Sequence, residues 1–562
     1  MDHGEEGERL PESVAPPLVS RHRRDAICFQ VGTSLAMIRA QQLAMSVAGI
    51  APDQSPTAPQ AASCSHAHAM QAAPKGHYSR FFAKPAQPIA ADEETKLIEL
   101  GNSMRYEVER EGTMTPRIGY TYFGQFLGHD LTHDVTPLPG PYSEPEKTPN
   151  FRTAAFDLDH VYGEGPERSP YLYEGEEGAE TFKLGVTIPG GYQRDLPMRH
   201  GRVLIGDLED KRNLDNLLLR QLHVLFLKFH NEAIRQLQTN RGFESVADVL
   251  GDGTLFERAR RLVCWHYQWI IRHDYLPRIL HNDVWNHQSN RTARKPGAGF
   301  SVPIEFSLAA FRFGHSMVRN AYRLNCRQKR VMIGELMALG QKAEPIADDY
   351  LVEWGTFFDG LPTSGPQASS SYIDTSVSRA MHGLSPGTIR LSNTLEAVDP
   401  SNLPVRTLLR GARAQLPSGQ EVSDALLSQG RIKPSDRLST SELTRDTCDR
   451  SGSAVHKNGL EDNTPLFYYI LKEAELKANG ITLGPAGSSI VSEVIRSALE
   501  ADSDGYMAVA GPKWQLPQWH FPTGSQRPIN SLIGIVQLVG DDKLLPECEA
   551  HWRRFQLPSW SV

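Results

Sequence analysis

Three stretches of this chain place histidine, arginine or acidic side chains within otherwise apolar sequence. In the first, TYFGQFLGHDLTHD, Gln125 and His129 lie four residues apart, so they would share one face of a helix. A histidine in such a setting can be a hydrogen-bonded part of the core, or it can accept and return a proton in a reaction. The spacing leaves both interpretations open.

The second stretch, DLEDKRNLDNLLLRQL, places Arg212 and Asp215 three residues apart at the expected start of a helix. They could form an ion pair at the helix N-terminus, where the helix dipole favours the carboxylate. They could also supply charge to a reaction site.

The third stretch, EFSLAAFRFGHSMVRNAY, carries His315 on an apolar helix face shared with Leu308, Phe311 and Val318. An imidazole that projects from an apolar face has the setting of a haem-iron ligand. A core histidine has the same setting, so this pattern too has two interpretations.

The first stretch also contains the pattern HDxxHD, formed by His129, Asp130, His133 and Asp134. Two histidines four residues apart on one helix face could bind zinc or non-haem iron. The glutamate of the HExxH hydrolases, which acts as general base, is missing from this pattern. A non-haem metal hydrolase is therefore the weaker hypothesis.

The elements that must position these side chains are predicted to be helices. Apolar residues recur every three or four positions over 212–235, and two further helices are predicted over 256–272, ending before Pro277, and over 304–322. Strand-like alternation is scarce and several connections are long. We therefore predict a mainly α fold with long loops and little β structure.

Composition divides the chain into two parts. Residues 51–75 are rich in Ala, Pro, Ser, Gln and His and lack the apolar content of a core. We expect residues 1–76 to form a poorly ordered tail and residues 77–562 to form one large helical domain. The six cysteines lie far apart without a CxxC pair, and we expect them to be reduced thiols.

Charge and hydropathy exclude some partners and leave the compartment open. The 59 basic and 66 acidic residues give a net charge of -7, so no basic field attracts nucleic acid. No transmembrane segment is expected, and no signal peptide begins at Met1. A cytoplasmic or non-classically secreted protein is the expectation, and the oligomeric state is left open.

Five segments follow one another in the order found in one family: FGQFLGHD, TAAFDLDHVYG, the Arg212–Asp215 helix start, HDYLP and AFRFGHSMV. From about Tyr78 onward the chain resembles the animal-type haem peroxidases of the peroxidase–cyclooxygenase superfamily, and LLRGARAQLPSGQ and TPLFYYILKEAE resemble bacterial-type members. The resemblance implies haem b and reduction of hydrogen peroxide. The reducing substrate would be a small organic, phenolic-type donor, with halides as a second class.

The resemblance also assigns roles to single residues. His129 would be the distal histidine on the peroxide side of the haem, with Gln125 beside it and Arg212 as the catalytic arginine. His315 would be the proximal iron ligand, and Arg312 would lie next to the cofactor. Such a histidine and arginine would transfer a proton and stabilise the negative charge that develops on peroxide oxygen.

A calcium site is implied by the same resemblance. Its ligands would be Asp130, Thr153, the carbonyl of Ala155, Asp157 and Asp159. Oxygen ligands of this kind suit calcium, which would connect the His129 helix to the acidic loop.

Three positions depart from the family pattern. Gly128 stands where an aspartate forms a haem ester in other members, and Asp215 stands where glutamate forms the second ester. We therefore expect haem to be non-covalent or linked once, through Asp215. Thr407 replaces the asparagine that hydrogen-bonds the proximal histidine, which would weaken that contact.

Two further alternatives remain within the resemblance. A fatty-acid dioxygenase of the superfamily would need a radical-forming tyrosine three residues before His315, where this chain has Arg312. An inactive scaffold that binds haem or calcium would explain Gly128 and Thr407, but it would not need both His129 and Arg212.

Overall fold

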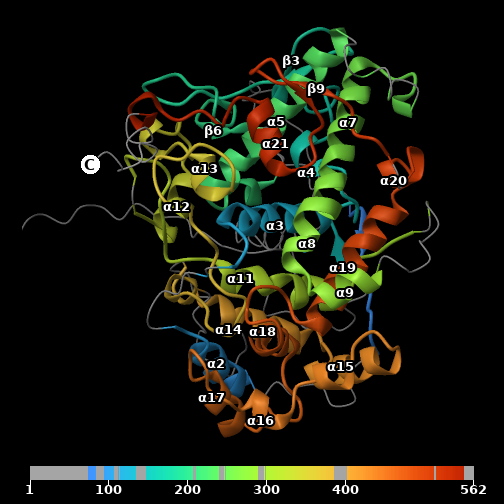
Figure 1. The fold of residues 1–562 in the computed structure, drawn as a ribbon, viewed down its shortest axis with the longest axis vertical. Coiled ribbons are helices and arrows are strands. Elements are labelled where there is room, and N and C mark those ends of the chain that lie inside the picture. Colours follow the sequence, from blue (N-terminus) through green and yellow to red (C-terminus); the bar gives the residue numbers. More distant parts are fainter. Residues whose placement is uncertain are drawn as a thin grey trace, which may run out of the picture.

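The computed structural model describes residues 74–83, 94–106, 112, 114–134, 147–206, 210–239, 243, 246, 249–288, 297, 299–328, 330–384, 401–511 and 514–549. Helices dominate the described chain, and the strands are short (Figure 1). One continuous hydrophobic core extends from Tyr78 to Leu538.

The centre of the molecule is built from a few helices that pack directly on one another. α5 (Leu217–Thr239) packs against α7 (Leu255–Ile270), and α3 (Ile118–Leu131) packs against α5. α3 crosses the middle of the view in Figure 1, and α11 (Gly314–Met317) lies directly beneath it and contacts it. α3 is therefore the layer between the two halves of the molecule.

The lower half in Figure 1 contains helices that follow α11 in the sequence, together with α2 from the N-terminal region and the short helices α8 and α9. The longer ones are α2 (Glu94–Ser103), α14 (Leu403–Arg413), α15 (Gly419–Ser428), α18 (Leu466–Lys477) and α19 (Pro485–Ala501). α14 packs against α2 and α18, and α18 packs against α19.

The other elements are short. The remaining α-helices are α4 (Asp159–Tyr162), α8 (Leu276–Ile279), α9 (Asn282–Gln288), α10 (Ile304–Leu308), α12 (Ile333–Gly340), α13 (Trp354–Phe357), α16 (Thr440–Leu443), α17 (Ser451–Lys457), α20 (Tyr506–Val509) and α21 (Leu532–Leu538). 3₁₀ turns are η3 (Pro170–Leu172), η5 (Lys211–Leu214), η7 (Ala310–Phe313), η8 (Asp348–Tyr350), η9 (Arg379–His382) and η10 (Pro434–Asp436), and η6 (Ile271–Tyr275) is a π turn.

The strands form antiparallel pairs of two residues each. The pairs are β1 (Gly76–His77) with β2 (Pro149–Asn150), β3 (Tyr173–Glu174) with β4 (Thr181–Phe182), β5 (Met198–Arg199) with β6 (Arg202–Val203), β7 (Ala321–Tyr322) with β8 (Val331–Met332), and β9 (Trp519–His520) with β10 (Gln526–Arg527).

The helix predicted over 212–235 is present but begins later. Residues Lys211–Leu214 form the 3₁₀ turn η5, and α5 starts only after Asn216, whose side-chain oxygen accepts from the backbone N–H of Leu219 at 2.8 Å. An asparagine in this role satisfies a free N–H at a helix start. Arg212 therefore lies in a turn, outside the regular helix.

The helix predicted over 256–272 begins as expected but does not end before Pro277. It continues through the π turn η6 into α8, whose first turn contains Pro277. The wider π turn accommodates a residue that has no backbone N–H to donate.

The continuous helix predicted over 304–322 is wrong. The segment is divided into α10, η7 and α11, and it ends in β7. Ala309, with φ -135° and ψ -70°, interrupts the helical backbone. His315 consequently lies on a short helix of its own, and its orientation is set by tertiary packing.

The N-terminal tail predicted for residues 1–76 lies mostly outside the described residues. Lys75 and Gly76, which were assigned to it, are already bonded to the folded chain: Lys75 N–H donates to the carbonyl of Asn150 at 2.9 Å, and Gly76 belongs to β1. The folded region therefore starts slightly before His77.

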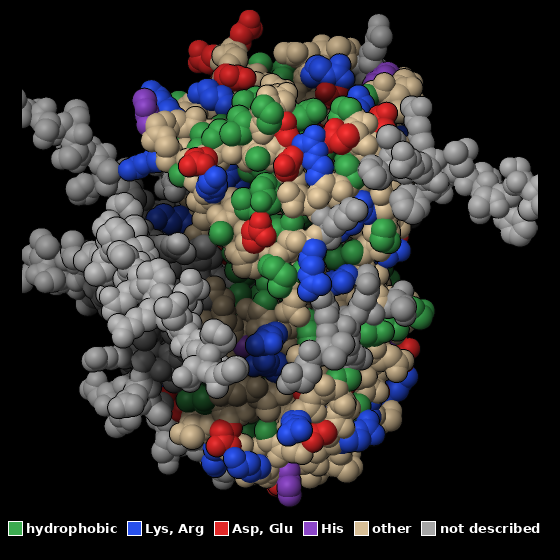
Figure 2. Space-filling model, turned by 90° about the vertical axis from the view of Figure 1, so that its left-hand side faces the viewer, with side chains coloured by type: hydrophobic (Ala, Val, Ile, Leu, Met, Phe, Trp, Pro, Cys, Tyr) green, Lys and Arg blue, Asp and Glu red, His purple; other side chains and the backbone are tan. Residues whose placement is uncertain are grey.

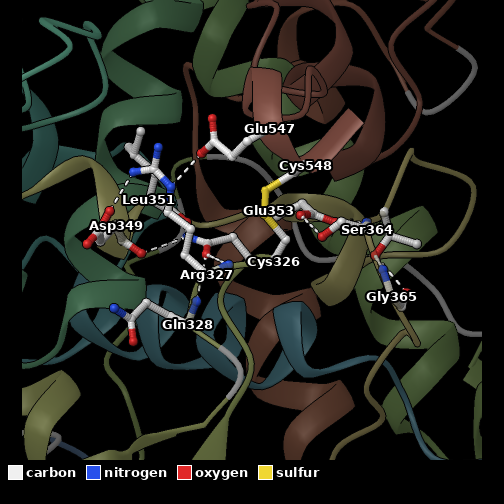
Figure 3. Close-up of a disulfide and its surroundings, with 12 residues drawn as sticks. Cys326, Arg327, Gln328, Asp349, Leu351, Glu353, Ser364, Gly365, Glu547 and Cys548 are labelled. Atoms are coloured by element: carbon white, nitrogen blue, oxygen red, sulfur yellow. Dashed lines mark hydrogen bonds and ion pairs between the residues drawn. A yellow bond between two sulfur atoms is a disulfide. The ribbon is translucent and has the colours of Figure 1, made fainter. Parts of the chain in front are cut away.

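The expectation that all cysteines are reduced is wrong for two of them. Cys326 and Cys548 form a disulfide, with Cα atoms 5.5 Å apart and a sequence separation of 222 positions. Figure 3 shows this bond beside the ion pairs that Arg327 makes with Asp349 and Glu547. Cys264 and Cys448 form no disulfide with another described residue, and Cys28 and Cys64 lie outside the described residues. The pair was not recognisable in the sequence because only the fold brings the two residues together.

On the face shown in Figure 2, basic and acidic side chains are interspersed among apolar ones. This mixture agrees with the small net charge of the sequence. Within the described ranges, no helix combines the length and the apolar content needed to cross a membrane.

Candidate functional site

His129 lies in the last turn of α3 and is fully buried. Within the described part of the chain, neither of its ring nitrogens has a hydrogen-bond partner, and Nε2 lies 3.7 Å from Oδ2 of Asp215. Burial, and then the charge of Arg212, hold the pKa of His129 well below its usual value. The imidazole is therefore neutral and can accept a proton.

Gln125 and Asp215 lie next to this imidazole, as the sequence predicts for Gln125. Nε2 of Gln125 donates to Oδ2 of Asp215 at 3.4 Å, and Nδ2 of Asn216 donates to Oε1 of Gln125 at 3.1 Å. Burial raises the pKa of Asp215 well above its usual value. A neutral base, an amide and a neutral acid therefore lie together at this side of α3.

Arg212 does not pair with Asp215, the helix ion pair considered from the sequence. Its guanidinium pairs with Asp210, with Nη2 at 2.7 Å from Oδ2, and donates to the backbone carbonyls of Thr132 at 2.6 Å and His129 at 3.1 Å. It is 2% exposed, so these contacts are made without competition from bulk water. Arg212 thus holds the C-terminal end of α3, where His129 lies.

Asp210 connects Arg212 to a second arginine. Burial would raise the pKa of Asp210, but Arg212 and Arg152 hold it well below its usual value. Arg152 pairs with Asp210 and, through Nη1, with Oδ1 of Asp159 at 3.0 Å. The sequence analysis did not identify Asp210 or Arg152, because neither stands in a recognisable motif.

His315 lies on α11, on the other side of α3 from α5, and is 3% exposed. Its ring makes an edge contact with Phe467 at 6.0 Å between centroids. Burial, followed by the charges of Arg312 and Arg406, holds the pKa of His315 well below its usual value. A neutral imidazole has the lone pair that a metal ligand needs.

Arg312 and Thr407 both lie on this side of the molecule. Nε of Arg312 donates to the carbonyl of Ser307 at 3.0 Å, and the hydroxyl of Thr407 donates to the carbonyl of Leu403, one turn earlier in α14, at 2.9 Å. Thr407 lines a small cavity together with Phe467, the residue that contacts His315. The Thr407 hydroxyl can still accept a hydrogen bond, although its proton is engaged within α14.

Tyr78 joins the two sides and was not recognised from the sequence. Burial raises the pKa of its hydroxyl well above the usual value, Asp134 raises it further, and Arg212 and Arg312 lower it. The arginine beside His129 and the arginine three residues before His315 therefore act on the same buried phenol. The helices that carry His129 and His315, α3 and α11, are in contact with each other.

The predicted calcium ligands with acidic side chains also converge. Burial, together with Asp159 and Asp130, raises the pKa of Asp157 to about 8, and burial and Asp159 raise the pKa of Asp130. Asp130, Asp159 and His160 each offer a ligand atom within 4.8 Å of the others. Such a cluster of buried carboxylates needs cations or protons to compensate its charge.

His160 is a further residue that the sequence analysis missed. Its Nδ1 is hydrogen-bonded to Oδ1 of Asp130 at 3.0 Å. The available signal was its position directly after Asp159, in a segment already considered for metal binding.

The HDxxHD pattern does not form the predicted pair of helical ligands. α3 ends at Leu131 and Thr132 is extended, with φ -138° and ψ 134°, so His133 does not lie one helical turn after His129. The groups of possible metal ligands found among the described residues do not include His133.

Part of the chain is similar in sequence to proteins of one known family. Residues 136–399 match the family model described as animal haem peroxidase. A peroxidase-like protein of Margaritifera margaritifera is 31% identical over 190 residues, which are 32% of this chain and 23% of that protein. The probable oxidoreductase PXDNL of Homo sapiens is 26% identical over 33% of this chain and 13% of its own length. The matched region thus spans less than a quarter of these curated relatives.

Solved structures show the same fold at low sequence identity. Peroxidase A from Dictyostelium discoideum has a TM-score of 0.54 at 15% identity, over 84% of this chain and 94% of its own. A fatty acid alpha-dioxygenase from Oryza sativa has a TM-score of 0.56 at 16% identity, over 85% of this chain and 82% of its own. These likenesses confirm the mainly α fold. By sequence, residues 136–399 match the animal haem peroxidase family, and the fold of the chain is similar to that of Peroxidase A from Dictyostelium discoideum.

Proposed function

We propose that this protein is a peroxidase that binds haem b between His129 and His315 and reduces hydrogen peroxide. The observation that carries the proposal is the buried, neutral imidazole of His129, whose two ring nitrogens have no partner among the described residues. A buried polar group without a partner is costly unless a ligand or water satisfies it. Haem-bound peroxide would be such a ligand.

The residues on both sides fit this cofactor. His315 would ligate the iron through its neutral imidazole, and Arg312 would provide a positive charge near the haem carboxylates. Haem would supply the redox centre that gives two electrons to hydrogen peroxide and regains them from the reducing substrate. Thr407 would accept a hydrogen bond from His315 directly or through a water in the small cavity beside it.

On the peroxide side, His129 would take the proton from the oxygen that binds and return it to the oxygen that leaves as water. Arg212 would hold the end of α3 in place through the carbonyls of His129 and Thr132. Its charge would also favour the negative charge that develops as the O–O bond breaks. Gln125 would orient groups in the pocket through its contact with Asp215.

The reducing substrate is proposed to be a small organic donor of the phenolic type. Arg312 occupies the position three residues before His315, and its guanidinium is bonded to Ser307, so this position cannot form a tyrosyl radical. This favours peroxidase over fatty-acid oxygenase activity. Without an ester at Gly128, oxidation of halides is the less favoured reaction.

A calcium ion is proposed at Asp130, Thr153, the carbonyl of Ala155, Asp157 and Asp159. The support is the buried group of Asp130, Asp159 and His160, whose ligand atoms lie within 4.8 Å of one another. Oxygen-rich sites of this kind suit calcium. The ion would connect the end of α3 to the loop that precedes α4.

The test is reconstitution of the full chain with haemin, followed by absorbance spectroscopy and a guaiacol assay with hydrogen peroxide. We expect a Soret band that is lost in His315→Ala, and a band that is retained in His129→Ala together with loss of guaiacol oxidation. His456→Ala, at a side chain that is 75% exposed, is the control. Absence of a Soret band in the wild type would overturn the proposal.

A further inference from the structure

The carboxylate of Asp159 already holds two cationic side chains of its own chain. Nζ of Lys75 lies 2.9 Å from Oδ2, and Nη1 of Arg152 lies 3.0 Å from Oδ1. The Asp159 side chain is 4% exposed, so water screens these pairs only weakly. Burial would raise the pKa of Asp159, but Arg152 and Lys75 lower it.

The two cations differ in how firmly they are held. Arg152 is buried and also pairs with Asp210, so its position is determined from two sides. Lys75 comes from the N-terminal edge of the folded chain, and its side chain is 30% exposed. Its backbone N–H donates to Asn150, and β1 follows directly. The backbone of Lys75 is thus anchored, while its ammonium can turn toward solvent.

A divalent ion at the proposed calcium site would need the same carboxylate. Like charges a few ångströms apart repel strongly where burial limits screening. A calcium ion bound to Asp159 would therefore lie close to the ammonium of Lys75 and repel it. Because the Lys75 side chain is partly exposed, its ammonium can move into solvent and so reduce this repulsion.

We propose that Lys75 is an internal competitor of the divalent cation at Asp159. The ammonium compensates the charge of Asp159 when no ion is bound, lowers the affinity of the site, and turns toward solvent when the ion binds. This inference rests on the calcium site of the proposed function, and it concerns a residue outside the set of ligands.

The experiment is titration of calcium chloride into the full chain by calorimetry, after removal of metal with a chelator and without added haemin. Lys75→Met, which removes the charge and keeps the length of the side chain, is expected to bind calcium about tenfold more tightly than the wild type. Lys75→Arg keeps the charge and should stay within about twofold of the wild type. Lys457→Met removes an exposed lysine from a pair with Glu99, and it should have no effect.

The inference would be overturned if Lys75→Met bound calcium with the same affinity as the wild type or more weakly. It would also be overturned if neither the wild type nor Lys75→Met bound calcium at millimolar concentration. If Lys75→Met does not fold, Lys75→Gln replaces it. The rise in melting temperature caused by calcium is a second readout, and it should be larger for the neutral variant than for the wild type.

The proposal that the protein binds haem is tested independently of the calcium measurement, because its readout is the Soret band of haemin-treated protein. Tighter calcium binding by Lys75→Met without any Soret band in the wild type would support the inference and overturn the haem assignment. A Soret band in the wild type, with no change in calcium affinity in Lys75→Met, would support the haem assignment and overturn the inference about Lys75.

Discussion

Nη2 of Arg212 donates a hydrogen bond to the backbone carbonyl of His129 at 3.1 Å. Nη1 of the same guanidinium donates to Thr132, and Nε and Nη2 contact Asp210. The arginine proposed for catalysis therefore acts on the backbone that carries the proposed base. His129 is held by this contact and by the buried packing of α3.

Arg212→Lys is expected to slow the reaction with peroxide by roughly a hundredfold while haem binding is retained. Lysine keeps the charge but cannot donate from three fixed directions, so the turn that carries His129 loses part of its support. Stopped-flow measurement of the Soret change with hydrogen peroxide checks this. Arg235→Lys, at an exposed pair with Glu232, is the control. An unchanged rate in Arg212→Lys would show that the contact with His129 has no role in the reaction.

The geometry of Asp215 predicts haem that can be extracted. Its Oδ2 accepts from Gln125 and lies near His129, and its side chain is one methylene shorter than the glutamate that forms the ester in other members. Acid-acetone treatment of reconstituted protein exposed to peroxide should therefore remove all of the haem. Asp215→Glu should leave a fraction of haem on the protein. Acid-resistant haem in the wild type would contradict this prediction and assign an ester to Asp215.

His266 should make the protein sensitive to acid. Nδ1 of its ring is hydrogen-bonded to the carbonyl of Leu262, and Nε2 accepts from Nε1 of Trp519 at 3.0 Å. Burial lowers its pKa from 6.5 to about 4. Between pH 6.5 and about 4, His266 therefore binds a proton more readily in the unfolded state than in the folded state. The stability that neutral His266 contributes to the folded protein is thus present above pH 6.5 and is lost as the pH falls toward about 4.

His266→Gln should reduce the loss of stability across this interval by about 1 kcal/mol per pH unit. Urea unfolding at several pH values measures the slope. His456→Gln, at an exposed histidine, should leave the slope as it is in the wild type. The same slope in His266→Gln as in the wild type would exclude His266 as a source of acid sensitivity.

The disulfide between Cys326 and Cys548 should stabilise the folded protein. It connects two segments separated by 222 residues, so it restricts the unfolded chain. Cys548→Ser should lower the free energy of unfolding by about 2–4 kcal/mol. Reductant should lower the melting temperature of the wild type and leave that of Cys548→Ser unchanged. Cys448→Ser, at an exposed cysteine outside this disulfide, should behave as the wild type.

Local patterns in the amino-acid sequence were sufficient to predict α5, α7 and the neighbouring positions of Gln125 and His129. Helical periodicity depends on residues three and four positions apart, so it is readable in one segment at a time. The break at Ala309 was missed because the apolar pattern of residues 304–322 continues through it.

The contacts that distinguish the site join residues far apart in sequence. Arg212 reaches His129 across 83 positions, Lys75 reaches Asp159 across 84, and Cys326 reaches Cys548 across 222. The resemblance to the haem peroxidases predicted that an arginine, a histidine and several carboxylates would serve one site, whereas local spacing left their roles open. The sequence could not predict that Arg212 pairs with Asp210 and not with Asp215, or that Lys75 pairs with Asp159. Those ion pairs depend on which backbone segments the folded core brings together.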